Sequence, residues 1–213
     1  MERKKDLEKL SLYFLIIMFT VGIIGHSFNP LLNLMLHLTP FTLLLTGAVV
    51  LYHYVYEDSI KIIGILLLIY VITFFVEVAG VETGIIFGNY YYGEVLGLKL
   101  LGVPLIIGFN WTLIILGAYV ISIRITRNSF LIASISGLIA VVFDYSLEPV
   151  AIKLKYWVWE GDIVPARNYL AWFIIAFFSA LILTFSGFKN KRYIAFYYVI
   201  IQFIFFLILS IAL

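Results

Sequence analysis

Two acidic side chains lie inside apolar stretches of the chain, where ionisable groups are rare. Glu77 falls within the apolar run 60–79, and Asp144 falls within the run 130–147. A carboxylate deep in lipid costs roughly 2.5–3.5 kcal/mol on insertion scales, so such residues face other helices and usually serve a function. Either acid alone is also explained by a structural hydrogen bond to a neighbouring helix. Two acids at matching depth favour the functional interpretation.

A third acid is spaced to share a helix face with Asp144. Glu148 follows it by four residues, so on a helix both side chains point the same way. Like charges this close in a low dielectric cannot both ionise cheaply, and one carboxyl is expected to keep its proton at neutral pH. A protonated acid in a dry pocket is a proton donor, which is the group needed to protonate a carbon–carbon double bond.

Aromatic residues accompany these acids along the chain and make up 18% of it. They have two interpretations, an interfacial aromatic belt or a cage whose desolvated rings each stabilise a cation by about 2 kcal/mol or more. For Trp157 and Trp159 alone, the belt is the simpler explanation. The clustering of rings beside the acids favours the cage. The candidate substrate-binding residues are Tyr90, Tyr92, Asn110, Trp111, Tyr145, Trp157, Trp159, Asn168 and Trp172.

The composition indicates which secondary-structure elements hold these side chains. Hydrophobic residues form 64% and charged residues 12% of the 213 positions, which excludes a soluble globule, a disordered chain and a nucleic-acid binder. About 20 apolar residues cross a bilayer. We therefore predict an all-α, polytopic transmembrane bundle forming a single domain, 1–213. The seven expected spans are 12–25, 31–52 (kinked at Pro40), 60–79, 103–123, 130–147, 168–185 and 193–213.

The charges predict the orientation of the bundle. With the N-terminus inside, ten of the 14 Lys and Arg residues fall in inner segments and four in outer ones, so the positive-inside rule favours an N-in, C-out arrangement. We expect a multi-pass protein of the cell membrane whose first apolar run is a retained span. The polar, Gly- and Tyr-rich segment 80–102 is expected to form a lid or a re-entrant segment.

Metal and cofactor chemistry find little support in the sequence. The chain has no cysteine, which excludes thiolate ligands and cysteine nucleophiles. His26, His37 and His53 lie at different depths and fit no ligand spacing, so they are expected to be structural. No cofactor and no metal are predicted.

Two blocks of the sequence, about 77–104 and 144–172, carry a family resemblance. The first contains Glu77, Gly80-Val81-x-Thr83-Gly84 and Phe87-Gly88-x-Tyr90-x-Tyr92. The second contains Asp144-x-x-x-Glu148-Pro149, Tyr156-Trp157-x-Trp159 and Pro165-x-x-Asn168-Tyr169. Together they resemble the integral-membrane carotenoid hydratases, of the cyanobacterial carotenoid 1,2-hydratase and archaeal bisanhydrobacterioruberin hydratase types. Glu148 stands where that family more often has Asp, which keeps the acid.

The resemblance implies hydration of the terminal isopropylidene double bond of a linear carotenoid without a cofactor. Glu77 or Asp144 would protonate the alkene, and Glu148 or the remaining acid would position the water. The long apolar substrate would enter from the bilayer, so membrane lipid is the expected surrounding. A second copy of the chain and other carotenoid-pathway enzymes are compatible partners, and nucleic acid is not.

Three other functions share some of these features. A lycopene-type cyclase would use the same protonation but quench the cation with an internal double bond. A proton-coupled transporter would use buried acids as relays, although an alternating-access carrier is expected to show sequence repeats and none is seen. A carotenoid-binding protein without catalysis would keep the acids for structure alone.

Overall fold

The computed structural model describes residues 2–55, 60–188 and 192–213 of the chain, with side chains described from Asp6 onward and from Lys61 after the first gap. In these ranges, seven helices are long and apolar enough to cross a membrane, which confirms the predicted fold class. They are α1 (Glu2–Ser27), α2 (Asn29–Val55), α3 (Ile60–Thr83), α4 (Leu105–Ile125), α5 (Ser129–Lys153), α6 (Ala166–Phe185) and α7 (Ile194–Ala212).

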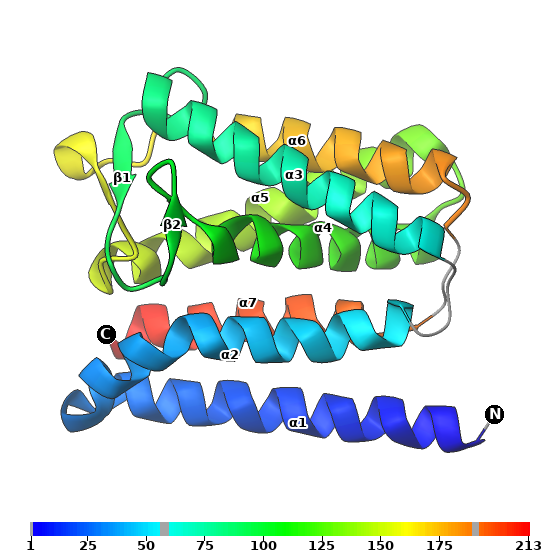
Figure 1. The fold of residues 1–213 in the computed structure, drawn as a ribbon, viewed down its shortest axis with the longest axis horizontal. Helices are drawn as coiled ribbons and strands as arrows, with labels where there is room; N and C mark the ends of the chain where they lie inside the picture. The colour runs from blue at the N-terminus through cyan, green and yellow to red at the C-terminus, as the bar shows by residue number, and fades with distance from the viewer. Residues whose placement is uncertain (1, 56–59, 189–191) are drawn as a thin grey trace.

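The seven helices pack as two groups around α4. In Figure 1, α3, α4, α5 and α6 lie on one side, while α1, α2 and α7 lie on the other. Helix α4 contacts α2, α3, α5, α6 and α7 and is the most buried of the seven. The most extensive helix–helix contact joins α5 and α6. The two acids predicted to meet therefore lie on helices that flank the central one.

The helices extend beyond the apolar runs that predicted them. Helix α3 continues to Thr83, and α5 continues to Lys153, past the predicted end at residue 147. Pro149 lies inside α5, and Pro40 lies inside α2, which runs unbroken from Asn29 to Val55. Hydropathy marks only the part of a helix that suits lipid, and bundles tolerate proline where neighbours satisfy the freed backbone group. Glu148 is therefore a helical residue, one turn beyond Asp144.

Short strands close one end of the bundle (Figure 1). Strand β1 (Tyr90–Tyr92) pairs antiparallel with β4 (Trp157–Trp159), and β2 (Lys99–Leu100) pairs with β3 (Val103–Pro104). A 3₁₀ turn, η1 (Glu160–Asp162), follows β4. We call residues 84–104 and 154–165 the cap. The segment 80–102, expected as a lid or a re-entrant segment, is thus partly helix α3 and partly this paired cap.

The cap is tied together by backbone contacts as well as by its strands. The amide of Gly93 donates to the carbonyl of Tyr156 at 2.9 Å, and the amide of Glu160 donates to the carbonyl of Asn89 at 2.9 Å. Gly88 has a φ of 128°, a conformation that side chains rarely adopt, and it lies against Trp159 and Pro165. Two segments about 70 residues apart are therefore held as one layer.

Charge is distributed unevenly between the two ends of the bundle. Lys61, Arg124, Arg127 and Arg192 lie at the end opposite the cap. The side chains of Arg3, Lys4, Lys5, Lys189 and Lys191, which also entered the orientation prediction, lie outside the described residues. The chain ends of α1 and α7 lie at opposite ends of the bundle (Figure 1).

The predicted orientation is testable with single cysteines, because the chain has none of its own. Glu94 in the cap and Arg127 in the α4–α5 loop are both exposed. In intact cells, a membrane-impermeant maleimide should label Glu94→Cys, and label Arg127→Cys only after the cells are opened. The reverse pattern would show that the cap faces the cytoplasm.

The α5–α6 contact predicts a packing-sensitive glycine. A Cβ at Gly137 would come within 2.7 Å of the Phe173 ring and 2.9 Å of its carbonyl oxygen. Gly137→Leu should therefore lower the unfolding free energy by about 1–3 kcal/mol, the usual cost of overpacking, seen as a lower melting temperature in detergent. Gly64→Leu is the matched control, because a Cβ there meets nothing within 4 Å. Equal melting temperatures for the two variants would contradict this packing.

Candidate active site

Three carboxyl groups converge beneath the cap. Glu77 comes from α3, and Asp144 and Glu148 come from α5, and their side chains are 3%, 2% and 3% exposed. They line one cavity of about 20 Å³, roughly the room of a single water molecule. The helices thus bring together the three acids that the sequence singled out.

Glu77 is held by two tyrosines of strand β1. The hydroxyl of Tyr92 donates to Glu77 Oε2 at 2.8 Å, and the hydroxyl of Tyr90 donates to the same oxygen. Burial, and after it the negative charge of Glu77, raises the pKa of both phenols well above the ordinary tyrosine value. The two phenols therefore keep their protons and remain hydrogen-bond donors to Glu77.

Glu148 is held by two tryptophans of strand β4. The indole N–H groups of Trp157 and Trp159 each donate to Glu148 Oε2 at 3.0 Å. An indole N–H donates and cannot accept, so Glu148 Oε2 acts as the acceptor in both bonds. Trp157 and Trp159 are 7% and 4% exposed, so these rings face the cavity and do not form an interfacial belt.

Asp144 has a different partner. The side-chain amide of Asn168, on α6, donates to Asp144 Oδ2 at 2.6 Å and lies 3.5 Å from Glu148 Oε1. Asn168 is 2% exposed, and its position on the first turn of α6 is fixed by the extensive α5–α6 contact. A single amide therefore links the two acids of α5.

The register of the cap strands explains how these donors reach the acids. Tyr90 pairs with Trp159, and Tyr92 pairs with Trp157. Successive residues of a strand point to opposite faces, so these four side chains share the face turned toward the helices, while Tyr91 between them is exposed. One small sheet therefore supplies four hydrogen-bond donors to two carboxyl groups.

Stacked rings form the remaining wall of the cavity. Trp111 of α4 and Trp172 of α6 stack with ring centroids 3.5 Å apart, and Phe87 of the cap stacks on Trp172 at 5.4 Å. Trp111 also contacts Phe143 edge-on at 6.1 Å. All four tryptophans of the chain therefore line this one cavity, as a ring cage requires.

Phe87 and Phe143 were not among the predicted site residues. They lie behind the tryptophans and support the stack. Phe87 stands in the Phe87-Gly88 part of the first sequence block, which was the available signal, whereas Phe143 is one of many apolar residues on α5 and gives no signal of its own.

Two predicted site residues lie away from the cavity. Asn110 Oδ1 accepts hydrogen bonds from Tyr198 and Gln202 of α7, both at 3.1 Å, because residue 110 faces α7 while residue 111 faces α6. Tyr145 is 70% exposed and packs beside Tyr169, because it follows Asp144 on α5 and points outward. Neither residue lines the cavity that holds the acids, and their contact with substrate stays a prediction.

The cavity has an unusual electrostatic character. Its ten lining residues are three acids, one amide and six aromatic residues, with no basic side chain among them: Glu77, Tyr90, Tyr92, Trp111, Asp144, Glu148, Trp157, Trp159, Asn168 and Trp172. In the part of the chain that the structure describes, no group of three or more His, Asp or Glu side chains is arranged to hold a metal ion.

The histidines do not converge with these acids. His26 and His37 each use Nδ1 to bond the carbonyl four residues earlier on their own helix, at 2.7 Å. His53 bonds the Ser11 hydroxyl at 2.8 Å between α2 and α1. These contacts agree with the structural role expected of them.

Comparison with known proteins identifies the family of the chain. Over 119 residues, the chain is 30% identical to the bisanhydrobacterioruberin hydratase of Haloarcula japonica, and the aligned part is 52% of this chain and 41% of that relative. No solved structure matches the chain. A family model described as carotenoid biosynthesis protein matches residues 38–213, a range that includes every residue lining the cavity. The family resemblance expected from the two sequence blocks is thereby confirmed, and the chain belongs to the carotenoid biosynthesis protein family.

Proposed function

We propose that the protein is a carotenoid hydratase that adds water across the terminal isopropylidene double bond of a linear carotenoid. The observation that carries the proposal is the convergence of Glu77, Asp144 and Glu148 in a tryptophan-walled cavity with room for about one water. The family and the hydratase relative support a carotenoid as the substrate. No cofactor is invoked.

Asp144 is the proton donor in this proposal. Three negative charges cannot be held together in a low-dielectric cavity that has no basic residue, so at least one carboxyl keeps a proton. Donated hydrogen bonds favour the charged form. Among the described residues, Glu77 and Glu148 each receive two such bonds on one oxygen, whereas Asp144 receives the single amide of Asn168. The proton is therefore assigned to Asp144.

Glu148 is the base that takes the proton of the attacking water. Its two indole donors stabilise its negative charge and fix its position. Asn168 lies between it and Asp144 and orients both acids. Glu77, held by the two phenols, stays negative and offsets the positive charge that develops in the cavity.

The proposed reaction has three steps. The Asp144 proton adds to the alkene carbon that carries one hydrogen, the π bond breaks, and a tertiary cation forms at the dimethyl carbon. Water attacks that carbon through oxygen, and Glu148 accepts the proton that the water loses, giving a tertiary alcohol. Transfer of that proton from Glu148 to the neighbouring Asp144 restores the starting state.

The ring cage serves the cationic step. A desolvated aromatic ring stabilises a nearby cation by about 2 kcal/mol or more, and the four tryptophans line the cavity beside the acids. Space for one water favours hydration over cyclisation, because a cyclase must exclude water from the same cation. The alkene end itself does not fit in about 20 Å³, so the cavity walls must part when substrate binds.

The first prediction concerns the product and the acid. In a host that makes lycopene, the protein should convert it to pigment heavier by one water per reacted end. Asp144→Asn should reduce the rate by about 10²–10⁴-fold, the usual contribution of a general acid, without lowering the melting temperature. The measurement is pigment mass and amount by liquid chromatography and mass spectrometry.

The matched control for this prediction is Glu82→Gln, which removes an exposed acid of the same helix as Glu77 and should leave turnover unchanged. A product of unchanged mass would identify a cyclase or isomerase. Full activity in Asp144→Asn would overturn the assignment of the acid, and unaltered pigment from folded wild-type protein across several acyclic carotenoids would exclude the hydratase.

The second prediction separates the contribution of the indole hydrogen bonds to turnover from the contribution of the aromatic rings. Trp159→Phe keeps an aromatic face but removes one of the two N–H donors to Glu148. A hydrogen bond to a charged group contributes about 1.5–3 kcal/mol, so turnover should fall about tenfold or more, while Trp159→Leu should cost more because the ring is lost too. Equal activity of Trp159→Phe and wild type would show that the indole N–H has no part in holding Glu148.

A further inference from the structure

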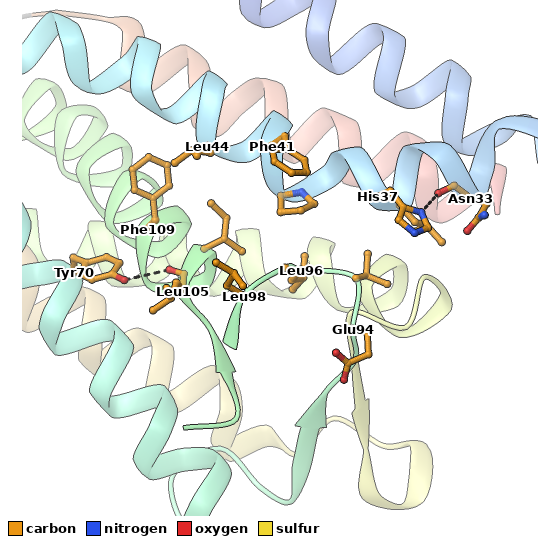
Figure 2. A pocket seen from close by; sticks show the side chains of 15 residues that line it. Asn33, His37, Phe41, Leu44, Tyr70, Glu94, Leu96, Leu98, Leu105 and Phe109 are labelled. Atoms are coloured by element: carbon orange, nitrogen blue, oxygen red, sulfur yellow. Dashed lines mark hydrogen bonds between the residues drawn. The ribbon is translucent and has the colours of Figure 1, made fainter. Parts of the chain in front are cut away.

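A large cavity lies outside the acid site. It is a groove of about 750 Å³ bounded by α2, α3, α4 and the loop between β1 and β2. Figure 2 shows Asn33 and His37 at one end of it, and Tyr70 and Phe109 at the other. Its size is that of sites that bury most of a bound organic molecule. We call it the α2–α4 groove.

The α2–α4 groove and the acid cavity are built from the same elements. On α4, Phe109 lines the groove and Trp111 lines the cavity. In the cap, Tyr92 lines the cavity, and Glu94, two residues later, lines the groove. On α3, Tyr70 lines the groove and Glu77 lines the cavity. The two spaces are therefore neighbours, separated by α4 and by the cap segment that leaves β1.

The lining of the groove suits a hydrocarbon. Phe41, Leu44 and Leu98 project into it (Figure 2), and Leu36 also lines it. Its one charged lining residue, Glu94, is paired with Lys99 at 2.7 Å. Aromatic rings at the deep end, near the middle of α3, offer flat faces to a conjugated chain.

We propose that the α2–α4 groove binds the polyene chain of the acyclic carotenoid while one end of that molecule reacts in the acid cavity. The inference rests on the proposed function, because a substrate of many isoprene units cannot be contained in a cavity of about 20 Å³. The groove holds the unreactive length of the molecule alongside α4 and the cap.

A second apolar cavity serves as the control site for the binding experiment. It has a volume of about 340 Å³ and lies between α4, α5 and α7, where Leu138 and Ile200 line it. It has no polar lining and shares no residue with the cap. Filling it should leave polyene binding unchanged if the chain lies in the α2–α4 groove.

The test measures binding separately from turnover. Lycopene is the probe, added to purified protein in nanodiscs of neutral phospholipid, and the induced circular dichroism of its visible band reports binding. The Asp144→Asn background prevents conversion. Leu36→Trp and Leu44→Trp narrow the groove from α2, and Leu138→Trp fills the second cavity. Melting temperatures confirm that each variant is folded.

The expected result is a loss of lycopene affinity on the order of tenfold or more in Leu36→Trp and Leu44→Trp, and none in Leu138→Trp. Undiminished binding in both α2 variants, or loss confined to Leu138→Trp, would overturn the groove assignment. Binding that depends on the groove in a wild-type protein that adds no water would refute the hydratase proposal and leave the groove standing. Hydration of lycopene at an unchanged rate in both α2 variants would refute the groove assignment and leave the hydratase proposal standing.

Discussion

Three carboxyl groups enclosed by aromatic rings inside a helix bundle, with no basic residue among the described residues that line their cavity, are the constraint on which the structure depends. Removing charged groups from water is costly, and their mutual repulsion adds to that cost. The protein offsets it with hydrogen bonds from phenols, indoles and one amide, and not with cations. A site satisfied in this way is suited to hold a proton, because no cation lies among the described residues that line it.

The cap follows from the same constraint. Helices alone bring Glu77 and Asp144 near each other, but most of the donors come from strands β1 and β4. Their pairing places Tyr90 opposite Trp159 and Tyr92 opposite Trp157. The sheet therefore links the acid of α3 to the acids of α5, and the cap is part of the site as well as its cover.

Much of this arrangement was predictable because it follows from local patterns. Apolar run length gave the seven helices, and the rarity of carboxylates in such runs gave Glu77 and Asp144. A four-residue spacing placed Glu148 on the same face as Asp144. Asn168 and the four tryptophans were identified through the same clustering and through family resemblance, and they do line the cavity.

The remaining features depend on contacts that no local pattern encodes. The β1–β4 pairing joins segments about 70 residues apart, and three-residue strands are too short to show alternation. Helix rotation sends Asn110 toward Tyr198 and turns Tyr145 outward, although both neighbour a true cavity residue in sequence. Helix α5 continues past the predicted end at residue 147 and through Pro149, because proline is tolerated there when surrounding groups satisfy the backbone.

Infrared spectroscopy tests the central claim, that one proton resides on Asp144 within an otherwise negative cluster. The substrate-free protein in nanodiscs should show the carbonyl stretch of a protonated carboxylic acid near neutral pH, shifted to lower frequency in heavy water. That band should disappear in Asp144→Asn and persist in Glu82→Gln. A wild-type spectrum with only carboxylate bands, or a protonated-acid band unchanged in Asp144→Asn, would contradict the account.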